Sequence, residues 1–394
     1  MQFIISFIFI ILIFEIILSI LTNSLKKKFQ WILTMKDEFP IFSKEKLNKF
    51  YNHSYDSVLG WDRKNNTSGK EYSNKITKFN IGTKGFRISK KRKKTFASVY
   101  GDSFAFCRYV NDNKTWESYF ENKIKKNLLN YGVGNYGLDQ SFLKFLKKKD
   151  KNKIIIFNVV PETIARINSY WKHYREFGNI LAFKPIIKIS KKDHMKITKI
   201  KIKKNYSEKQ IHNTFSQIKK IDIFYKSKFS RNIFKFPYLF NFLSNPKKNI
   251  YIFFFLTLDE IFKNNYFFKK AQKIILEENI MESHLMYDDE FFNSKLKNLI
   301  YFMNSKISKS RKKMILIITP QLIDLKFKTL KYSTNFYKNL DKDITCLDLT
   351  EDLVKIKNYQ KLYLQDVYGG HLNERGNKTI SNLIYKKLKN KKIL

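Results

Sequence analysis

The stretch TFASVYGDSFAFCRYV, at residues 95–110, is the most informative part of this 394-residue chain. Its first six residues predict a short buried strand that runs directly into Gly101, Asp102 and Ser103, and the apolar residues that follow can start a helix. A serine on the turn from strand to helix presents its hydroxyl at the carboxyl edge of a sheet, where the helix N-terminus favours negative charge. That position suits a nucleophile; the alternative is a plain helix N-cap.

Glycine marks a second place of interest. The chain has 12 Gly, and none lies between Asn179 and Tyr368, so the glycines that do occur indicate tight turns or close backbone approach. Residues 128–137, LLNYGVGNYG, predict a short strand that enters a glycine-rich loop. Such a loop can aim a backbone N–H at an oxyanion. A plain turn is the alternative, and a phosphate loop is disfavoured because the Lys and Ser/Thr of that motif are absent.

A third glycine-rich segment lies near the C-terminus. Residues 366–377, DVYGGHLNERGN, precede a stretch with helical spacing. Of the six His, only His371 has a nearby Asp, Asp366, and a loop bounded by glycines. Pairing with an Asp fixes the tautomer of a histidine that acts as general base. The alternative is an exposed polar loop before a terminal helix.

Three more apolar runs predict strands, at 153–160, 313–319 and 343–348, and helical stretches intervene, including 114–126 and 291–307. Short runs without polar alternation are typical of a parallel sheet that is covered on both faces. Alternating strands and helices predict the α/β class, with a doubly wound α/β/α sheet and functional groups at the carboxyl ends of the strands.

The N-terminal segment predicts a single transmembrane helix. Sixteen of the twenty residues from Phe3 to Thr22 are Phe, Ile or Leu, enough to cross about 30 Å of hydrocarbon. Glu15, the one charge, costs up to about 3 kcal/mol, which the apolar residues outweigh. A cleaved signal peptide is disfavoured because no basic side chain precedes the run and no small-residue cleavage site follows it. A buried core helix is the other alternative. We expect membrane lipid to be a partner through residues 3–22.

Composition excludes several classes of protein. The net charge is +43, but only nine of the 77 basic residues are Arg, and Lys is spread along the whole chain. Because Arg reads phosphates and bases, we expect no specific nucleic-acid partner. Two cysteines, Cys107 and Cys346, exclude a disulfide scaffold and a thiolate zinc cage. We expect no metal, since the histidines show no paired spacing with a third ligand, and we expect no cofactor.

Taken in order, the GDS of 101–103, the NYGVGNYG loop and the Asp–His segment resemble the conserved blocks of the SGNH/GDSL hydrolases, in their membrane-anchored, envelope-associated form. The segments YDSVLGW (55–61) and TKGFR (83–87) resemble the lead-in of those proteins, and Trp116 also matches. The resemblance covers about 55–170 and 312–390; the Lys- and Phe-rich segment between them matches no family that we recognise.

The resemblance implies a serine esterase or acyltransferase of the SGNH/flavodoxin-like fold. Ser103 would be the nucleophile, His371 the general base and Asp366 its orienting acid, while the oxyanion donors would be Ser103, Gly132, Asn135 and Thr163. The substrate would be an O-acylated cell-envelope glycan or a lipid-linked saccharide. The catalytic domain would then lie outside the cytoplasm, although Lys26, Lys27 and Lys28 favour the cytoplasmic face by the positive-inside rule.

The sequence departs from the family pattern at three points. Asn135 stands where the family places a Gly, Thr163 stands where similar proteins carry an Asn, and Asp366 lies five residues before His371 where three are usual. A catalytically silent carbohydrate-binding protein is therefore an alternative, as is a basic membrane-surface or nucleic-acid-binding protein. The expected organisation is an anchor (1–24), a lead-in (25–94), a first hydrolase part (95–186), a helical insertion (187–311) and a second hydrolase part (312–394).

Overall fold

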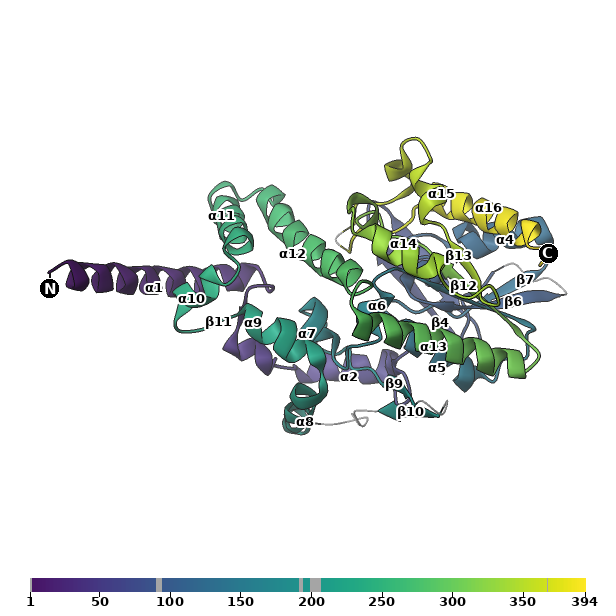
Figure 1. The fold of residues 1–394 in the computed structure, drawn as a ribbon, viewed down its shortest axis with the longest axis horizontal. Helices are drawn as coiled ribbons and strands as arrows, with labels where there is room; N and C mark the ends of the chain where they lie inside the picture. The colour runs from purple at the N-terminus through teal and green to yellow at the C-terminus, as the bar shows by residue number, and fades with distance from the viewer. Residues whose placement is uncertain (1, 90–93, 191–193, 199–206, 367) are drawn as a thin grey trace. The chain divides into compact units, whose positions relative to one another are not determined.

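The computed structural model describes residues 2–89, 94–190, 194–198, 207–366 and 368–394 (Figure 1). Val367 of the third glycine segment, and parts of the predicted 187–311 insertion, lie outside the described residues. The chain divides into two compact units. Unit 1 comprises Met1–Asn48, Ser169–Phe183 and Ile202–Asn279, and unit 2 comprises Lys49–Asn168, Lys184–Lys201 and Ile280–Leu394. The 187–311 segment is thus shared between the units.

Unit 2 contains a five-stranded parallel sheet, in the order β13-β12-β8-β6-β7. Numbered along the chain, this order is 2-1-3-4-5, which is the flavodoxin-like arrangement. All five predicted strands are present, and their bounds are β6 Thr95–Gly101, β7 Asn127–Asn130, β8 Ile154–Val159, β12 Lys313–Ile318 and β13 Thr345–Asp348.

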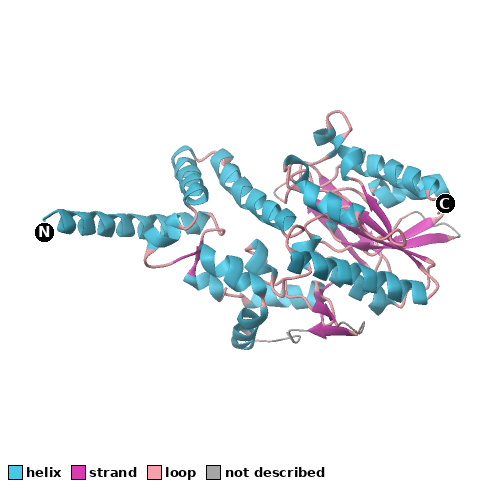
Figure 2. Cartoon of the chain, viewed as in Figure 1, coloured by secondary structure: helices cyan, strands magenta, loops and turns pink. Residues whose placement is uncertain are grey.

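Helices cover both faces of this sheet, as Figure 2 shows for the magenta strands. Phe157 of β8 faces one core and Ile156 the other, because successive side chains of a strand point to opposite sides. The first core includes α5 (Leu138–Lys148), α13 (Glu290–Lys309) and α14 (Leu330–Lys338). The second includes α3 (Ser103–Phe106), α4 (Trp116–Ile124), α15 (Thr350–Val354) and α16 (Glu374–Asn390). The predicted three-layer arrangement is therefore present.

Smaller elements complete unit 2. The antiparallel pairs are β2 (Tyr55–Asp56) with β3 (Gly60–Trp61), β4 (Thr67–Tyr72) with β5 (Ile76–Ile81), and β9 (Ile186–Ile189) with β10 (Met195–Thr198). The one-turn helix α6 spans Thr163–Arg166, and α2 spans Lys44–His53 across the unit boundary.

Unit 1 is mostly helical. Its α1, Gln2–Lys28, contains the predicted membrane segment and is the one helix among the described residues that is long and apolar enough to cross a membrane. The other elements are α7 (Lys172–Glu176), α8 (Glu208–Ile221), α9 (Ser230–Asn232), α10 (Tyr238–Leu243), α11 (Pro246–Phe262), and the β1–β11 pair (Leu33–Thr34 with Ile233–Phe234). The next helix, α12 (Tyr266–Leu285), begins in this unit. Trp171, Phe183 and Phe215 form a cluster of mutually stacked rings in the core of unit 1.

Candidate active site

The carboxyl ends of β6, β7 and β8 meet at one edge of the sheet of unit 2, because the three strands are parallel neighbours. The ends of β6 and β7 carry the first two predicted polar segments, and the end of β8 leads to Thr163. At the end of β6, Gly101 lies so close to β8 that a Cβ atom there would overlap the carbonyl oxygen of Asn158. Glycine is therefore required at this position, and the chain can turn at once into α3, whose first residue is Ser103.

Ser103, His371 and Asp366 form one continuous hydrogen-bonded line. The Ser103 Oγ atom lies 2.8 Å from Nε2 of His371, and Nδ1 of the same ring lies 2.7 Å from Oδ2 of Asp366. The carboxylate can only accept, so Nδ1 donates to it and Nε2 is left to accept the Ser103 hydroxyl proton. The structure thus brings together the three side chains that the sequence singled out from positions up to 268 residues apart.

The Asp366 carboxylate also organises the loop that carries His371. It accepts the backbone N–H groups of Tyr368 (2.7 Å), Gly370 (3.3 Å) and His371 (2.8 Å). Gly369 and Gly370 both have positive φ, which lets the chain fold back within five residues. This compact turn explains how an Asp five residues before the His reaches its ring.

The electrostatic surroundings keep Asp366 ionised. Burial alone would raise the pKa of this carboxyl, but the hydrogen bond from the His371 ring, the charge of that ring and the backbone donors outweigh it, and the net pKa lies below the ordinary value. A charged carboxylate at this place can stabilise the positive charge that forms on the ring when His371 takes the Ser103 proton.

Aromatic rings fix the orientation of His371. Phe104 stacks on the imidazole with ring centroids 5.1 Å apart, and Tyr109 meets it edge-on at 5.5 Å. Ser103 is 8% exposed and His371 4% exposed, so both reactive side chains are largely buried. No pattern in the sequence indicates the Tyr109 contact, whereas Phe104 follows Ser103 directly.

Gly132 was predicted to donate its backbone N–H to an oxyanion. In the structure this N–H donates to Oδ1 of Asn130 at 3.0 Å. A Cβ atom at Gly132 would overlap the backbone nitrogen of Phe106, so this glycine serves the close approach of the loop to α3. Asn130 in turn donates to the carbonyl of Ala105 at 2.7 Å, which ties the loop to the helix that carries Ser103.

Thr163, which was predicted to donate its hydroxyl proton to an oxyanion, uses the oxygen of that hydroxyl within the protein. Its side chain is fully buried, and its hydroxyl oxygen accepts the backbone N–H of Leu138 at 2.9 Å. The hydroxyl therefore holds the N-terminus of α5, where the first N–H groups of a helix lack partners within the helix. The sequence pattern could place Thr163 after the third strand, but it could not show which backbone group its hydroxyl would meet.

Asn135, another predicted oxyanion donor, lies beside Gly134 in the same loop. Asn135 is half-buried with φ of 67°, a left-handed conformation that Asn tolerates better than other residues with a side chain. Gly134 is also half-buried, and nothing lies within 4 Å of the place where its Cβ would be. Within the described residues, no protein acceptor faces the backbone N–H of Ser103 or Gly134.

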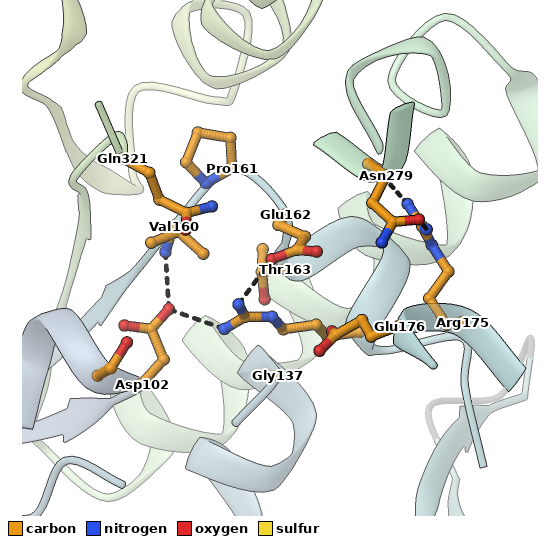
Figure 3. A network of polar contacts seen from close by, with 12 residues as sticks. Asp102, Gly137, Val160, Pro161, Glu162, Thr163, Arg175, Glu176, Asn279 and Gln321 are labelled. Carbon is orange, nitrogen blue, oxygen red and sulfur yellow. Dashed lines mark hydrogen bonds and ion pairs between the residues drawn. The ribbon is translucent and has the colours of Figure 1, made fainter. Parts of the chain in front are cut away.

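Asp102 and Arg166 form a buried ion pair that the sequence did not predict (Figure 3). Oδ1 of Asp102 accepts the N–H of Phe104 at 2.8 Å, and Oδ2 accepts the N–H of Val160 at 2.9 Å. The Arg166 guanidinium lies 3.4 Å from the same carboxylate and 2.6 Å from that of Glu162. Burial raises the pKa of Asp102 despite the opposing charge of Arg166. The pair links the ends of β6 and β8 beneath Ser103.

Cys107 is excluded as a rival nucleophile by its surroundings. Its thiol is buried and lies 3.1 Å from Oε2 of Glu117. Burial, followed by the neighbouring Glu117 carboxyl, raises the pKa of this thiol well above its ordinary value. Since the thiolate is the nucleophilic form, Cys107 is unreactive here.

No protein-family model and no curated protein matches the chain. Among solved structures, the chain is similar to that of a lipolytic protein assigned to the G-D-S-L family from Desulfitobacterium hafniense DCB-2. The likeness covers 74% of this chain and 98% of that chain, at 10% identity and a TM-score of 0.33. A likeness of this size carries no argument about function, which rests on the geometry of the site itself.

Proposed function

We propose that the protein is a membrane-anchored SGNH-type serine esterase or acyltransferase that acts on O-acyl groups. The observation that carries the proposal is the continuous line from Ser103 Oγ through the His371 ring to Asp366, with separations of 2.8 Å and 2.7 Å. A nucleophile, a base and an orienting carboxylate within hydrogen-bond reach form the arrangement that acyl transfer requires.

In the proposed reaction, Ser103 Oγ attacks the carbonyl carbon of an ester while its proton passes to Nε2 of His371. The imidazolium then donates that proton to the leaving alcohol oxygen, and an acyl-enzyme remains on Ser103. Water, or the hydroxyl of a second sugar, loses a proton to His371 and attacks the acyl-enzyme, which restores the serine hydroxyl. Asp366 stabilises the imidazolium in both steps.

The negative oxygen that forms on the carbonyl needs donors, and the Gly132 N–H is already hydrogen-bonded to Asn130. The proposal assigns this role to the backbone N–H of Ser103 and to the turn at Gly134 and Asn135. Two features support this assignment: the N–H groups of Ser103 and Gly134 face no protein acceptor among the described residues, and the loop that holds the turn is tied to α3 through Asn130.

The substrate class and the location of the enzyme rest on the resemblance to envelope-associated hydrolases. We propose an O-acylated glycan or a lipid-linked saccharide of the cell envelope as substrate. We also propose that α1 anchors the chain, with its N-terminus inside and residues from about 25 onward outside the cytoplasm. A reporter that is active only in the periplasm, fused after Leu394, should then be active. Activity from a cytoplasmic reporter alone would reverse this topology.

A fluorophosphonate probe tests the proposed chemistry, because it reacts covalently with an activated serine. We expect the full-length protein to be labelled, Ser103→Ala to lose all labelling, and the matched variant Ser216→Ala, on the exposed face of α8, to be labelled like wild type. Equal labelling of Ser103→Ala and wild type would overturn the assignment of the nucleophile.

A second candidate is a carbohydrate-binding protein of the same fold without catalysis. It is favoured by the hydrogen bond of the Gly132 N–H to Asn130, which leaves one donor fewer for an oxyanion. Absence of probe labelling in a folded protein that still binds acylated glycans would support this candidate over the enzyme.

A further inference from the structure

Glu15, the one charged residue in the apolar run of α1, caps another helix of unit 1. Its two carboxylate oxygens accept the backbone N–H groups of Tyr238 at 2.6 Å and Leu239 at 2.8 Å. These N–H groups open α10 and have no partner within that helix. Glu15 is only 7% exposed, and Figure 1 shows α10 beside the C-terminal half of α1.

The position of this contact shows how far the start of α10 lies from the end of the apolar run of α1. The covered residues of α1 are Glu15, Leu18, Thr22 and Leu25, which lie on one face because they are spaced by three and four residues. Glu15 lies seven residues before Thr22, the last residue of the apolar run. At about 1.5 Å per residue, the start of α10 lies about 10 Å inside the end of the run.

The outward face of α10 and α11 is strongly apolar. Phe236 is 73% exposed and Phe240 is 74% exposed. Leu243, Ile250, Phe254 and Phe262 are exposed as well. Soluble proteins rarely leave a contiguous patch of this kind open to water. Both helices pack on α1, whose own exposed residues are also apolar.

Two Asn side chains satisfy backbone carbonyls before α10 and at its end. The Asn241 side chain donates to the carbonyls of Lys235 (2.8 Å) and Pro237 (2.7 Å), and the Asn249 side chain donates to the carbonyl of Phe242 (2.8 Å). In hydrocarbon no water is available, and each unsatisfied backbone group is strongly destabilising. Internal capping of this kind allows a short, irregular segment to enter the membrane beside a spanning helix.

We propose that α10 and α11 lie in the same membrane leaflet as the C-terminal half of α1, with their exposed aromatic face against lipid acyl chains. The proposal rests on the proposed anchoring by α1. Lys28 and Asp259 pair at 2.6 Å at the C-terminal ends of α1 and α11, which places the polar boundary there. Exposed Lys235, Lys247 and Lys263 can reach headgroups by extending their side chains. The anchor then consists of α1, α10 and α11, and these three helices together hold unit 1 in a fixed orientation.

The test uses an environment-sensitive fluorophore on single cysteines in the full-length chain, in a Cys346→Ala background, because the other thiol is buried. The protein is reconstituted in vesicles of phosphatidylethanolamine and phosphatidylglycerol. Probes replace Phe240 and Phe254 in the proposed lipid face, Phe9 in the anchor, and Gln217 on the polar face of α8 as the matched control. We expect the emission at Phe240 and Phe254 to be blue-shifted to the wavelength found at Phe9, and to be quenched by lipids with spin-labelled acyl chains, while Gln217 is neither shifted nor quenched.

Two results would overturn the proposal. Water-like emission at Phe240 and Phe254 with quenching at Phe9 would show that α1 is in the membrane and that α10 and α11 are not. A blue shift at Phe240 and Phe254 without lipid quenching would show that protein, such as a second copy of the chain, covers the face. Water-like emission at Phe9 as well would instead refute the anchoring by α1 on which the proposal rests.

Discussion

The carboxylate of Asp366 holds His371 twice, through the ring Nδ1 at 2.7 Å and through the backbone N–H at 2.8 Å. One oxygen atom, Oδ2, receives both hydrogen bonds, so the position of the main chain and the orientation of the ring are set together. This double contact compensates for the unusual spacing between the two residues, because the loop is shaped around the carboxylate rather than extended between them.

Replacing Asp366 by Asn tests this relationship. The amide can donate a hydrogen bond to Nδ1 and thereby favour the tautomer that cannot accept the Ser103 proton, and it supplies no charge to stabilise the imidazolium. We expect kcat for nitrophenyl acetate to fall about 10⁴-fold, with the fold retained by circular dichroism. The control Asp343→Asn, at an exposed position, should leave kcat unchanged. A loss below tenfold in Asp366→Asn would contradict the orienting role.

A substitution at Thr163 distinguishes a structural role of its hydroxyl from a catalytic one. Thr163→Val removes the hydroxyl that accepts the N–H of Leu138, and this buried donor is then left without its partner. We expect the free energy of unfolding to fall by about 1–3 kcal/mol, with kcat within a few-fold of wild type. Urea unfolding and steady-state kinetics measure the two effects. A loss of about 10²–10³ in kcat would restore Thr163 as an oxyanion donor.

Arg166 neutralises a carboxylate that lies beneath the nucleophile. In Arg166→Met, Asp102 and Glu162 keep their buried carboxylates without the guanidinium that lies between them. Breaking a buried pair by removing one partner costs about 3–5 kcal/mol, and we expect a loss near the lower end because backbone N–H groups still hold Asp102. Urea unfolding measures this loss, and Arg311→Met, at an exposed position, is the control. Equal stability of the two variants would refute the role of the pair.

Glu117 should make stability depend on pH. Burial raises its pKa to about 8 in the folded protein, against an ordinary value of 4.5, even though the hydrogen bond from Cys107 opposes the shift. The folded state therefore holds a proton that the unfolded chain releases, and the stabilising effect is complete below about 4.5 and is lost as the pH rises through about 8. Glu117→Gln should flatten the curve of unfolding free energy against pH in this window. The exposed control Glu45→Gln should keep the wild-type slope. An unchanged slope in Glu117→Gln would refute the shift.

The strands of the sheet and the three polar segments at its edge could be predicted from the sequence. Apolar runs such as IIIFNV fix the strands, and scarce glycines mark the turns where backbones come close, as at Gly101. The pairing of His371 with Asp366 was also predictable, since both lie in one short loop.

Other features depend on contacts that no local pattern encodes. The Gly132 N–H is taken by the side chain of Asn130, two residues away, and the Thr163 hydroxyl meets a backbone N–H that is 25 residues distant. Arg166 and Asp102 are brought together only by the packing of β6 against β8. Glu15 could be recognised as an unusual charge in an apolar helix, but its partner lies 223 residues away. Such pairings follow from tertiary structure, and hydrophobic periodicity does not reveal them.

The most direct test of the central claim is the mass of the enzyme after a single turnover with nitrophenyl acetate. The account predicts a transient acetyl group on the peptide that contains Ser103, which accumulates when deacylation is slowed at acid pH and is absent in Ser103→Ala. Turnover of nitrophenyl acetate by Ser103→Ala at the wild-type rate, or acetylation of a different residue in the wild-type protein, would contradict it.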